Sequence, residues 1–180
     1  MVYVLLGTGF EETEAIAPID LLRRAEIPTL TVALADKTVC GGHGIRVEAD
    51  ITIEEMDLTD MDMIVLPGGL GGVASIENSV KAMGLIQRQL LEGYPLAAIC
   101  AAPSILGKRG WVEGKRVTCY PGFEEQMKGA VCVDAPAVVD GKLITGRSAG
   151  AAMDFALTIV EEFCGAEQRK TLADGIVWPY

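Results

Sequence analysis

The 180-residue chain is 50% hydrophobic and 22% charged, and its formal net charge is -10. This length and apolar content suit one compact domain with a substantial core, so we predict a single domain over residues 1–180. Lys and Arg are scattered along an acidic chain, which argues against nucleic acid as a partner.

The first residues show no basic leader ahead of their short apolar run, and no apolar stretch is long enough to cross a bilayer. We therefore expect a cytoplasmic protein without a membrane partner. The five cysteines are an odd number, form no CxxC pair and are accompanied by a single histidine. This pattern argues against a disulfide scaffold and against a structural metal site.

Short apolar or β-branched runs alternate with helical patterns along the chain, beginning with a predicted strand at residues 2–6. A helix should follow, with Pro18 in its first turn. The residues expected on its buried face are Ile16, Ile19 and Leu22.

A second strand is predicted at residues 29–35, and the glycine-containing segment 37–50 indicates a hairpin or a pair of short strands. A buried strand at 61–66 should end at a tight turn. The helical pattern over 78–93 then places on one face Val80, Met83, Ile86 or Gln87, and Leu90.

The second half begins with a strand at residues 95–99 and a short helix. Brief strands follow over 115–146, then a helix over 149–163, and the final ten residues are expected on the surface. The buried face of this last helix should contain Met153, Ala156, Leu157 and Val160. The alternation predicts an α/β, doubly wound, mainly parallel sheet with helices on both faces.

In such a sheet the crevice lies beyond the carboxyl ends of the strands. Cys100 follows the predicted strand at 95–99, at a strand-to-helix elbow where the small Ala101 permits a tight turn. The N–H groups and the positive end of the following helix predict a lowered pKa for this thiol. A buried cysteine that acts as a small core residue is the alternative.

Two further strand ends carry candidate site residues. Gly68 and Gly69 follow the strand at 61–66, where glycine lets the backbone approach a ligand closely. The N–H groups of Gly69 and Ala101 are candidates for an oxyanion hole beside the sulfur. A plain turn is the alternative, and the "GGLGG" run lacks the spacing of a nucleotide-binding loop.

Three carboxylates, Glu11, Glu12 and Glu14, crowd the junction of the first strand and its helix. For Glu11 and Glu12 we expect solvated positions at the helix N-terminus. Glu14 lies nearest the crevice, where desolvation should raise its pKa and let it share a proton with the thiol. The single histidine, His43, is expected to be an exposed loop residue, with a reach to a crevice across a dimer interface as the alternative.

With these segments in view, the chain resembles the ThiJ/PfpI superfamily, in the branch of the parkinsonism-associated deglycase and its bacterial relatives. The resemblance covers nearly the whole chain and rests on "GFEETEAIAPIDLLRRA", "VLPGG", "AAICAAPSIL", "KRVTCYP", "LITGR" and "AMDFALTIVE". It implies that Cys100 is the reactive cysteine, that Glu14 hydrogen-bonds it and that Gly69 and Ala101 supply oxyanion-binding N–H groups. It also implies a flavodoxin-like fold and a homodimer that uses the first helix.

One position departs from the family pattern. Many relatives have a histidine near the cysteine, and here Tyr120 stands in that place. A Cys–His pair is therefore absent, which argues against peptidase chemistry, because hydrolysis usually needs a base to activate water. Tyr120, Gly68 and His43 remain possible accessory residues.

The resemblance implies a glyoxalase or deglycase that needs no cofactor and acts on methylglyoxal-type dicarbonyls or early glycation adducts. The alternative is a non-enzymatic redox sensor or redox chaperone that uses the same oxidisable cysteine. The other four cysteines fall in strand or helix patterns, so we expect them to be buried and slower to oxidise. Flavin binding is not expected, because the sequence shows neither a phosphate loop nor a stacking aromatic residue near the strand ends.

Overall fold

The computed structural model describes residues 1–179. Seven strands form one sheet in the order β10-β11-β7-β6-β1-β2-β5, and all of its pairs are parallel except β10 with β11. Its strands are β1 (Val2–Leu6), β2 (Thr29–Ala33), β5 (Ile51–Thr52), β6 (Met63–Leu66), β7 (Leu96–Ile99), β10 (Ala137–Asp140) and β11 (Leu143–Gly146).

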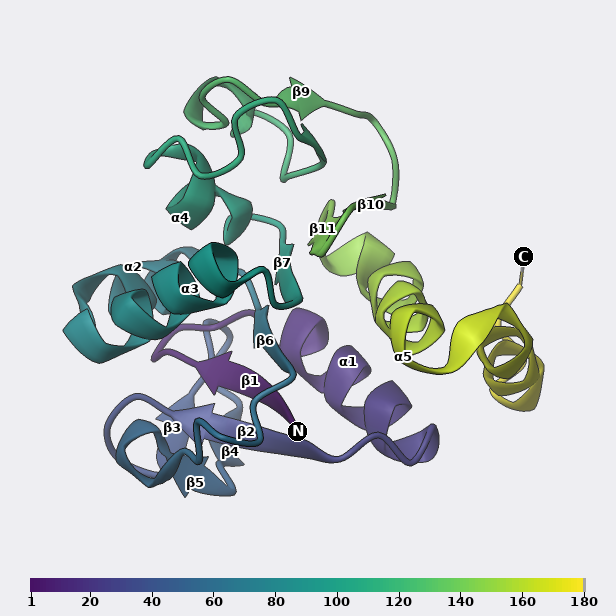
Figure 1. The fold of residues 1–180 in the computed structure, drawn as a ribbon. Coiled ribbons are helices and arrows are strands. Elements are labelled where there is room, and N and C mark those ends of the chain that lie inside the picture. The colour runs from purple at the N-terminus through teal and green to yellow at the C-terminus, as the bar shows by residue number, and fades with distance from the viewer. Residues whose placement is uncertain (180) are drawn as a thin grey trace.

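Helices cover both faces of this sheet, as Figure 1 shows. Helices α1 and α5 lie on one side, and α2 and α3 lie on the other. The helices are α1 (Glu12–Arg24), α2 (Leu70–Asn78), α3 (Val80–Glu92), α4 (Pro103–Gly107) and α5 (Ala152–Gly175), with 3-10 turns at Ile53–Glu55, Glu124–Gln126 and Ala149–Ala151. The predicted α/β, flavodoxin-like architecture is thus confirmed. No helix within residues 1–179 combines the length and apolar character needed to span a membrane.

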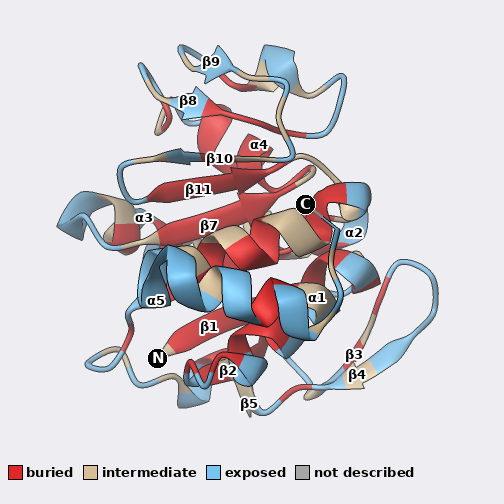
Figure 2. Ribbon diagram, turned by 90° about the vertical axis from the view of Figure 1, so that its right-hand side faces the viewer, coloured by how far each residue is buried: buried red, intermediate tan, exposed pale blue. Residues whose placement is uncertain are grey.

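The sheet separates two apolar cores. Successive strand residues face opposite sides of a sheet, and in β1 Val4 and Leu6 pack with α1 and α5, whereas Tyr3 and Leu5 pack on the α2 and α3 side. Figure 2 shows the central strands as buried and the outer side of α5 as exposed. Strands buried on both sides explain the near-continuous apolar runs in the sequence.

Two small sheets lie outside the main one. Strands β3 (Thr38–Cys40) and β4 (Arg46–Glu48) pair antiparallel, which confirms the predicted hairpin. Strands β8 (Arg116–Val117) and β9 (Val131–Cys132) form a short parallel pair. Figure 2 shows β8 and β9 together at the end of the molecule beyond β10.

The first helix begins earlier than the sequence predicts. Glu11 caps it by accepting a hydrogen bond from the Glu14 N–H at 2.7 Å, so Pro18 falls inside the helix rather than in its first turn. Proline there lacks the N–H that would bond the carbonyl four residues earlier, and its ring crowds that carbonyl. The shift leaves Ile16 exposed while Ile19 and Leu22 are buried.

Helix α2 is not expected from the sequence pattern, because two of its first three residues are Gly71 and Gly72, which disfavour helices. Their missing side chains have a packing reason: a Cβ on Gly72 would lie 2.7 Å from the Phe10 Cα. The predicted face of α3 is wrong at its start, where Val80 is the first helical residue and is 89% exposed, and right at Ile86, which is fully buried.

The last helix runs further than predicted. It continues to Gly175, with a break at Gly165, whose backbone is non-helical. Leu172 and Ala173 beyond the break are buried against the core shared with α1, so part of the segment expected on the surface packs inside.

We expect Gly72→Ala to lower the free energy of unfolding by about 1–3 kcal/mol, because a Cβ would press on the backbone of Phe10. Gly84→Ala in α3 is the matched control: a Cβ there would meet nothing within 4 Å, so helix propensity should stabilise the protein by about 0.5–1 kcal/mol. Urea denaturation measures both. Equal stabilisation by the two variants would contradict the close approach of α2 to Phe10.

Candidate active site

Three adjacent strands bring the predicted site residues together. Strands β1, β6 and β7 are neighbours in the sheet and end at the same edge. Glu14 lies in the first turn of the helix after β1, Gly68 and Gly69 follow β6, and Cys100 follows β7. The crevice predicted at this edge therefore contains the residues selected from the sequence.

Cys100 occupies a strained elbow. Its φ is 66°, in the left-handed region that residues other than glycine rarely adopt. Such a conformation costs about 1–3 kcal/mol and persists only where its surroundings fix it. Here the Cys100 N–H donates to the Gly146 carbonyl at 2.9 Å, and the Cys100 carbonyl accepts from the Tyr120 N–H at 2.9 Å. These two bonds hold the strained residue between neighbouring segments.

Glycine is required next to the elbow. A Cβ on Gly68 would lie 2.4 Å from Glu14 Oε2 and 2.8 Å from the Cys100 Cβ. Gly69 has a φ of 84°, and a Cβ there would lie 2.5 Å from the Gly9 carbonyl oxygen. The diglycine is therefore more than a plain turn, because it lets the backbone reach both functional side chains.

Glu14 is fully buried, at 0% exposure. Its Oε2 accepts a hydrogen bond from the Gly68 N–H at 2.9 Å, and its carboxyl also interacts with the Cys100 sulfur and the Ala149 N–H. Its Oε1 is buried without a close hydrogen-bond partner among the described residues. A buried oxygen of this kind is better satisfied by a carboxylic acid that donates its proton to the sulfur than by a carboxylate.

Burial raises the pKa of Glu14 from its ordinary 4.5 to about 7, against the hydrogen bonds from Cys100 and Gly68. The predicted increase is thus confirmed. Burial, and then the charge of the Glu14 carboxylate, raise the pKa of the Cys100 thiol to about 12, although the N–H groups of Ala101 and Gly69 point at the sulfur and oppose the increase. The pair therefore loses one proton near pH 7 and shares the other up to much higher pH.

The sequence-based prediction of a lowered pKa for the Cys100 thiol is wrong when the neighbouring Glu14 is ionised. The prediction rested on the positive end of a helix, but α4 has only five residues and contributes little dipole. It also left out the burial of the sulfur and the carboxylate beside it. The thiolate is favoured when Glu14 carries the shared proton, since the repelling charge is then gone.

The sulfur opens into a pocket of about 280 Å³. The residues that line it are Glu11, Gly69, Leu70, Cys100, Ala101, Tyr120 and Phe123. Tyr120, which stands where many relatives have a histidine, forms one wall with its ring edge-on to Phe123, 6.2 Å between centroids. Leu70 and Phe123 were not selected from the sequence, because nothing in their local pattern distinguishes them from other apolar residues.

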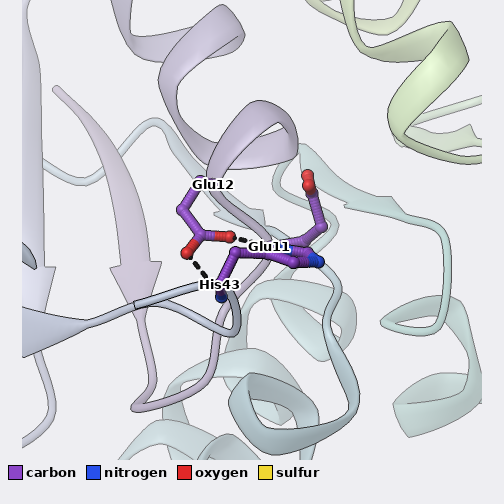
Figure 3. A group of neighbouring side chains, drawn as sticks. All are labelled: Glu11, Glu12 and His43. Atoms are coloured by element: carbon purple, nitrogen blue, oxygen red, sulfur yellow. Dashed lines mark hydrogen bonds and ion pairs between the residues drawn. The ribbon is translucent and has the colours of Figure 1, made fainter. Parts of the chain in front are cut away.

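His43 lies at a second hollow of about 420 Å³ that shares Glu11, Gly69 and Leu70 with the first. Its side chain is 74% exposed, which confirms an exposed loop residue. Its ring Nδ1 and backbone N–H lie 2.8 and 2.7 Å from the carboxylate oxygens of Glu12 (Figure 3). His43 is thus anchored beside the Cys100 pocket and does not line it.

The prediction of a solvated Glu12 is wrong. Glu12 is buried, and its hydrogen bonds from His43 and Ile45 lower its pKa although burial opposes this. A Cβ on Gly41 would lie 2.3 Å from Glu12 Oε1, so this carboxylate fastens the hairpin to the start of α1. Ligand atoms of Glu11, Glu12 and His43 lie within 4.8 Å of one another, yet the contacts drawn in Figure 3 join only Glu12 and His43. Glu11 instead caps α1 as expected.

The cysteines differ in exposure from the prediction. Cys119 is buried and Cys40 is half-buried, but Cys132 and Cys164 are exposed. Cys132 follows Val131 in the short strand β9, which has no covering layer, and Cys164 lies just before the break in α5. Apolar patterning identifies strands and helices, and it does not show whether an edge strand or a helix end is covered.

The raised pKa of Glu14 predicts that the free energy of unfolding depends on pH. The folded-state pKa of about 7 lies above the ordinary 4.5, so the folded protein holds an extra proton between these values. The stabilisation that this extra proton gives the folded protein is fully present below pH 4.5 and is lost as the pH rises through 7. The free energy of unfolding falls by about 3 kcal/mol over this range. Urea denaturation from pH 4.5 to 8 should show this fall in wild type relative to Glu14→Gln. A constant difference between the two proteins would contradict a raised Glu14 pKa.

Comparisons with known proteins agree with this geometry. The model of the DJ-1/PfpI family matches residues 1–162. A deglycase of Pyrococcus abyssi is 34% identical over 151 residues, which cover 83% of this chain and 90% of the relative. DJ-1 homolog B of Arabidopsis thaliana is 35% identical over 169 residues, and this chain spans 39% of that protein's length.

Solved structures of DJ-1 superfamily proteins share the fold of this chain. A mutant of a DJ-1 superfamily protein from Salmonella typhimurium superposes with a TM-score of 0.94 at 36% identity, covering 99% of this chain and 98% of that one. The match therefore extends from the sequence motifs to the whole fold. Because the family model spans most of the chain and the relatives share its sequence and architecture, the protein belongs to the DJ-1/PfpI family.

Proposed function

We propose that the protein is a cofactor-independent, cysteine-dependent glyoxalase or deglycase that acts on methylglyoxal-type dicarbonyls or on early glycation adducts. The observation that carries the proposal is the buried Glu14 carboxyl hydrogen-bonded to the Cys100 sulfur, which lines a pocket of about 280 Å³. Archaeal relatives that are named deglycases support the same reaction class. We propose Cys100 as the nucleophile and Glu14 as the proton carrier.

The first chemical step is addition to the aldehyde. The Cys100 sulfur forms a bond to the aldehyde carbon of methylglyoxal, and the carbonyl oxygen takes up the proton that Glu14 held, giving a hemithioacetal. The N–H groups of Gly69 and Ala101 already point at the sulfur, so they lie close to the oxygen that becomes negative during the attack.

Glu14, now a carboxylate, next removes the hydrogen from the former aldehyde carbon and leaves an enediolate. The hydroxyl proton on the first carbon moves to the oxygen of the second, and Glu14 returns its proton to the second carbon, which produces a thioester of lactate. Glu14, again a carboxylate, takes a proton from water as the water attacks the thioester carbonyl, which releases lactate and the Cys100 thiolate and restores the starting pair. The net reaction is the addition of one water to methylglyoxal, with no change in total oxidation state, so no cofactor is needed.

The pocket fits a small substrate. Its volume of about 280 Å³ accommodates a short dicarbonyl, and its lining is mainly apolar apart from Glu11 and the Tyr120 hydroxyl. Tyr120 brings no imidazole to activate water, which agrees with proton transfer within the substrate rather than with peptide hydrolysis. We also propose a homodimeric assembly, because the family resemblance implies one.

We expect Cys100→Ser to abolish lactate formation from methylglyoxal and Glu14→Gln to reduce kcat/KM by at least about 100-fold, because an amide cannot carry a proton between carbons. A stereospecific lactate assay measures turnover, and circular dichroism checks the fold. The control is Cys164→Ser, which removes an exposed thiol outside the pocket and should leave turnover unchanged. Full activity of Glu14→Gln would assign the proton transfer to another group.

A second function, redox sensing at the same cysteine, is favoured by a separate observation. The N–H groups of Gly69 and Ala101 and the Glu14 carboxyl all converge on a sulfur that is only partly buried. A sulfinate has two oxygens to accept hydrogen bonds from these donors, whereas a thiol has none.

We therefore expect graded peroxide to convert Cys100 to a sulfinate that resists further oxidation, because its oxygens are hydrogen-bonded. Peptide mass spectrometry should locate a two-oxygen adduct on Cys100 and show that Glu14→Gln shifts the product toward the sulfonate. Direct formation of the sulfonate in the wild type would contradict this role and would leave the catalytic proposal standing.

A further inference from the structure

A second pair of cysteines meets outside the site described above. Strands β8 and β9 run parallel with Val117 opposite Cys132, and the Val133 N–H donates to the Val117 carbonyl at 2.7 Å. Cys119 lies two residues beyond the end of β8. The Cys119 and Cys132 thiols interact with each other and line the same hollow, so the two side chains are neighbours.

Both thiols line one small hollow of about 170 Å³. Its other residues are Thr118, Glu124, Val133, Asp134 and Arg147. Arg147 forms an ion pair with Asp134 at its rim. Cys132 is exposed, so a reagent in solution can reach this member of the pair directly.

The two cysteines are not equivalent. Cys119 is 4% exposed, and burial raises the pKa of its thiol to about 12, with a further increase from the Cys132 and Glu124 charges. Cys132 is exposed; burial of its sulfur still raises its pKa, but the hydrogen bond from Cys119 acts in the opposite direction. Cys132 therefore ionises first and meets solvent, which makes it the attacking thiol and leaves Cys119 to react second.

We propose that Cys119 and Cys132 form a reversible intramolecular disulfide in exchange with low-molecular-weight disulfides. The Cys132 thiolate attacks one sulfur of the small disulfide, forming a mixed disulfide and releasing one thiol. Cys119 then loses its proton, attacks the Cys132 sulfur and releases the second thiol. The protein loses two hydrogens, and the small disulfide is reduced to two thiols, so the electrons balance.

Cys119 is not part of a regular strand. β8 ends at Val117, and Cys119 lies in an irregular segment after Thr118, whose N–H and hydroxyl are held by Thr145 and Ala135. The disulfide also acts on the wall of the Cys100 pocket, because Cys119 directly precedes Tyr120, whose N–H donates to the Cys100 carbonyl. This effect on the pocket rests on the proposed function, whereas formation of the disulfide does not.

The test uses the full chain incubated with oxidised glutathione, alkylated under denaturing conditions and analysed by peptide mass spectrometry. We expect a linked pair of peptides containing Cys119 and Cys132 in the wild type, in Cys100→Ser and in Cys40→Ser/Cys164→Ser, with loss of two hydrogens and reversal by a reducing thiol. Cys119→Ser should instead accumulate glutathione on Cys132, since the second thiol is missing.

Cys119→Ala is a second variant in case the serine disturbs the buried position, and circular dichroism checks both. Cys132→Ser should leave Cys119 unmodified, because the buried thiol does not react first. A disulfide that joins Cys100 to either residue, or the absence of glutathione from Cys132 in both Cys119 variants, would overturn the proposal. Lactate formation is not part of this readout, so its outcome is independent of the enzymatic proposal.

Discussion

The contact between the buried Glu14 carboxyl and the Cys100 sulfur is the interaction on which the rest of the site depends. Burial raises the pKa of both groups, so the pair gives up its first proton only near pH 7 and shares the second one above that pH. That proton links two chemistries that otherwise look separate. It supplies the acid and base for a dicarbonyl substrate, and it supplies a donor to the oxygens of an oxidised sulfur.

The fold maintains this contact by placing three strand ends side by side and removing side chains where the backbone must pass. Gly68 and Gly69 leave room for Glu14 and for the turn after β6, while hydrogen bonds to Gly146 and Tyr120 hold Cys100 in its left-handed conformation. The strain is local, and the surrounding parallel sheet is buried on both faces and rigid enough to maintain it. Backbone hydrogen bonds and one carboxyl thus hold the reactive sulfur in place.

The sequence contained enough information for the architecture and for the central residues. Alternating apolar runs predicted the strands, and the positions of Glu14, Gly69 and Cys100 after three of them predicted where these residues meet. Local patterns failed where tertiary contacts decide the outcome: α2 forms despite Gly71 and Gly72 because it packs on Phe10. Helix-end reasoning also failed for the Cys100 pKa, because desolvation and a neighbouring carboxylate depend on distances that no local pattern contains.

The most direct test of the shared proton is the infrared difference spectrum of wild type minus Glu14→Gln, recorded as a function of pH. The band to follow is the carbonyl stretch of a protonated carboxylic acid, which Glu14 contributes and glutamine does not. We expect this band to persist well above the ordinary glutamate pKa of 4.5 and to decline only near pH 7. A band that disappears near pH 4.5 would show that Glu14 ionises as a solvated carboxyl does, and would contradict the proton-sharing pair.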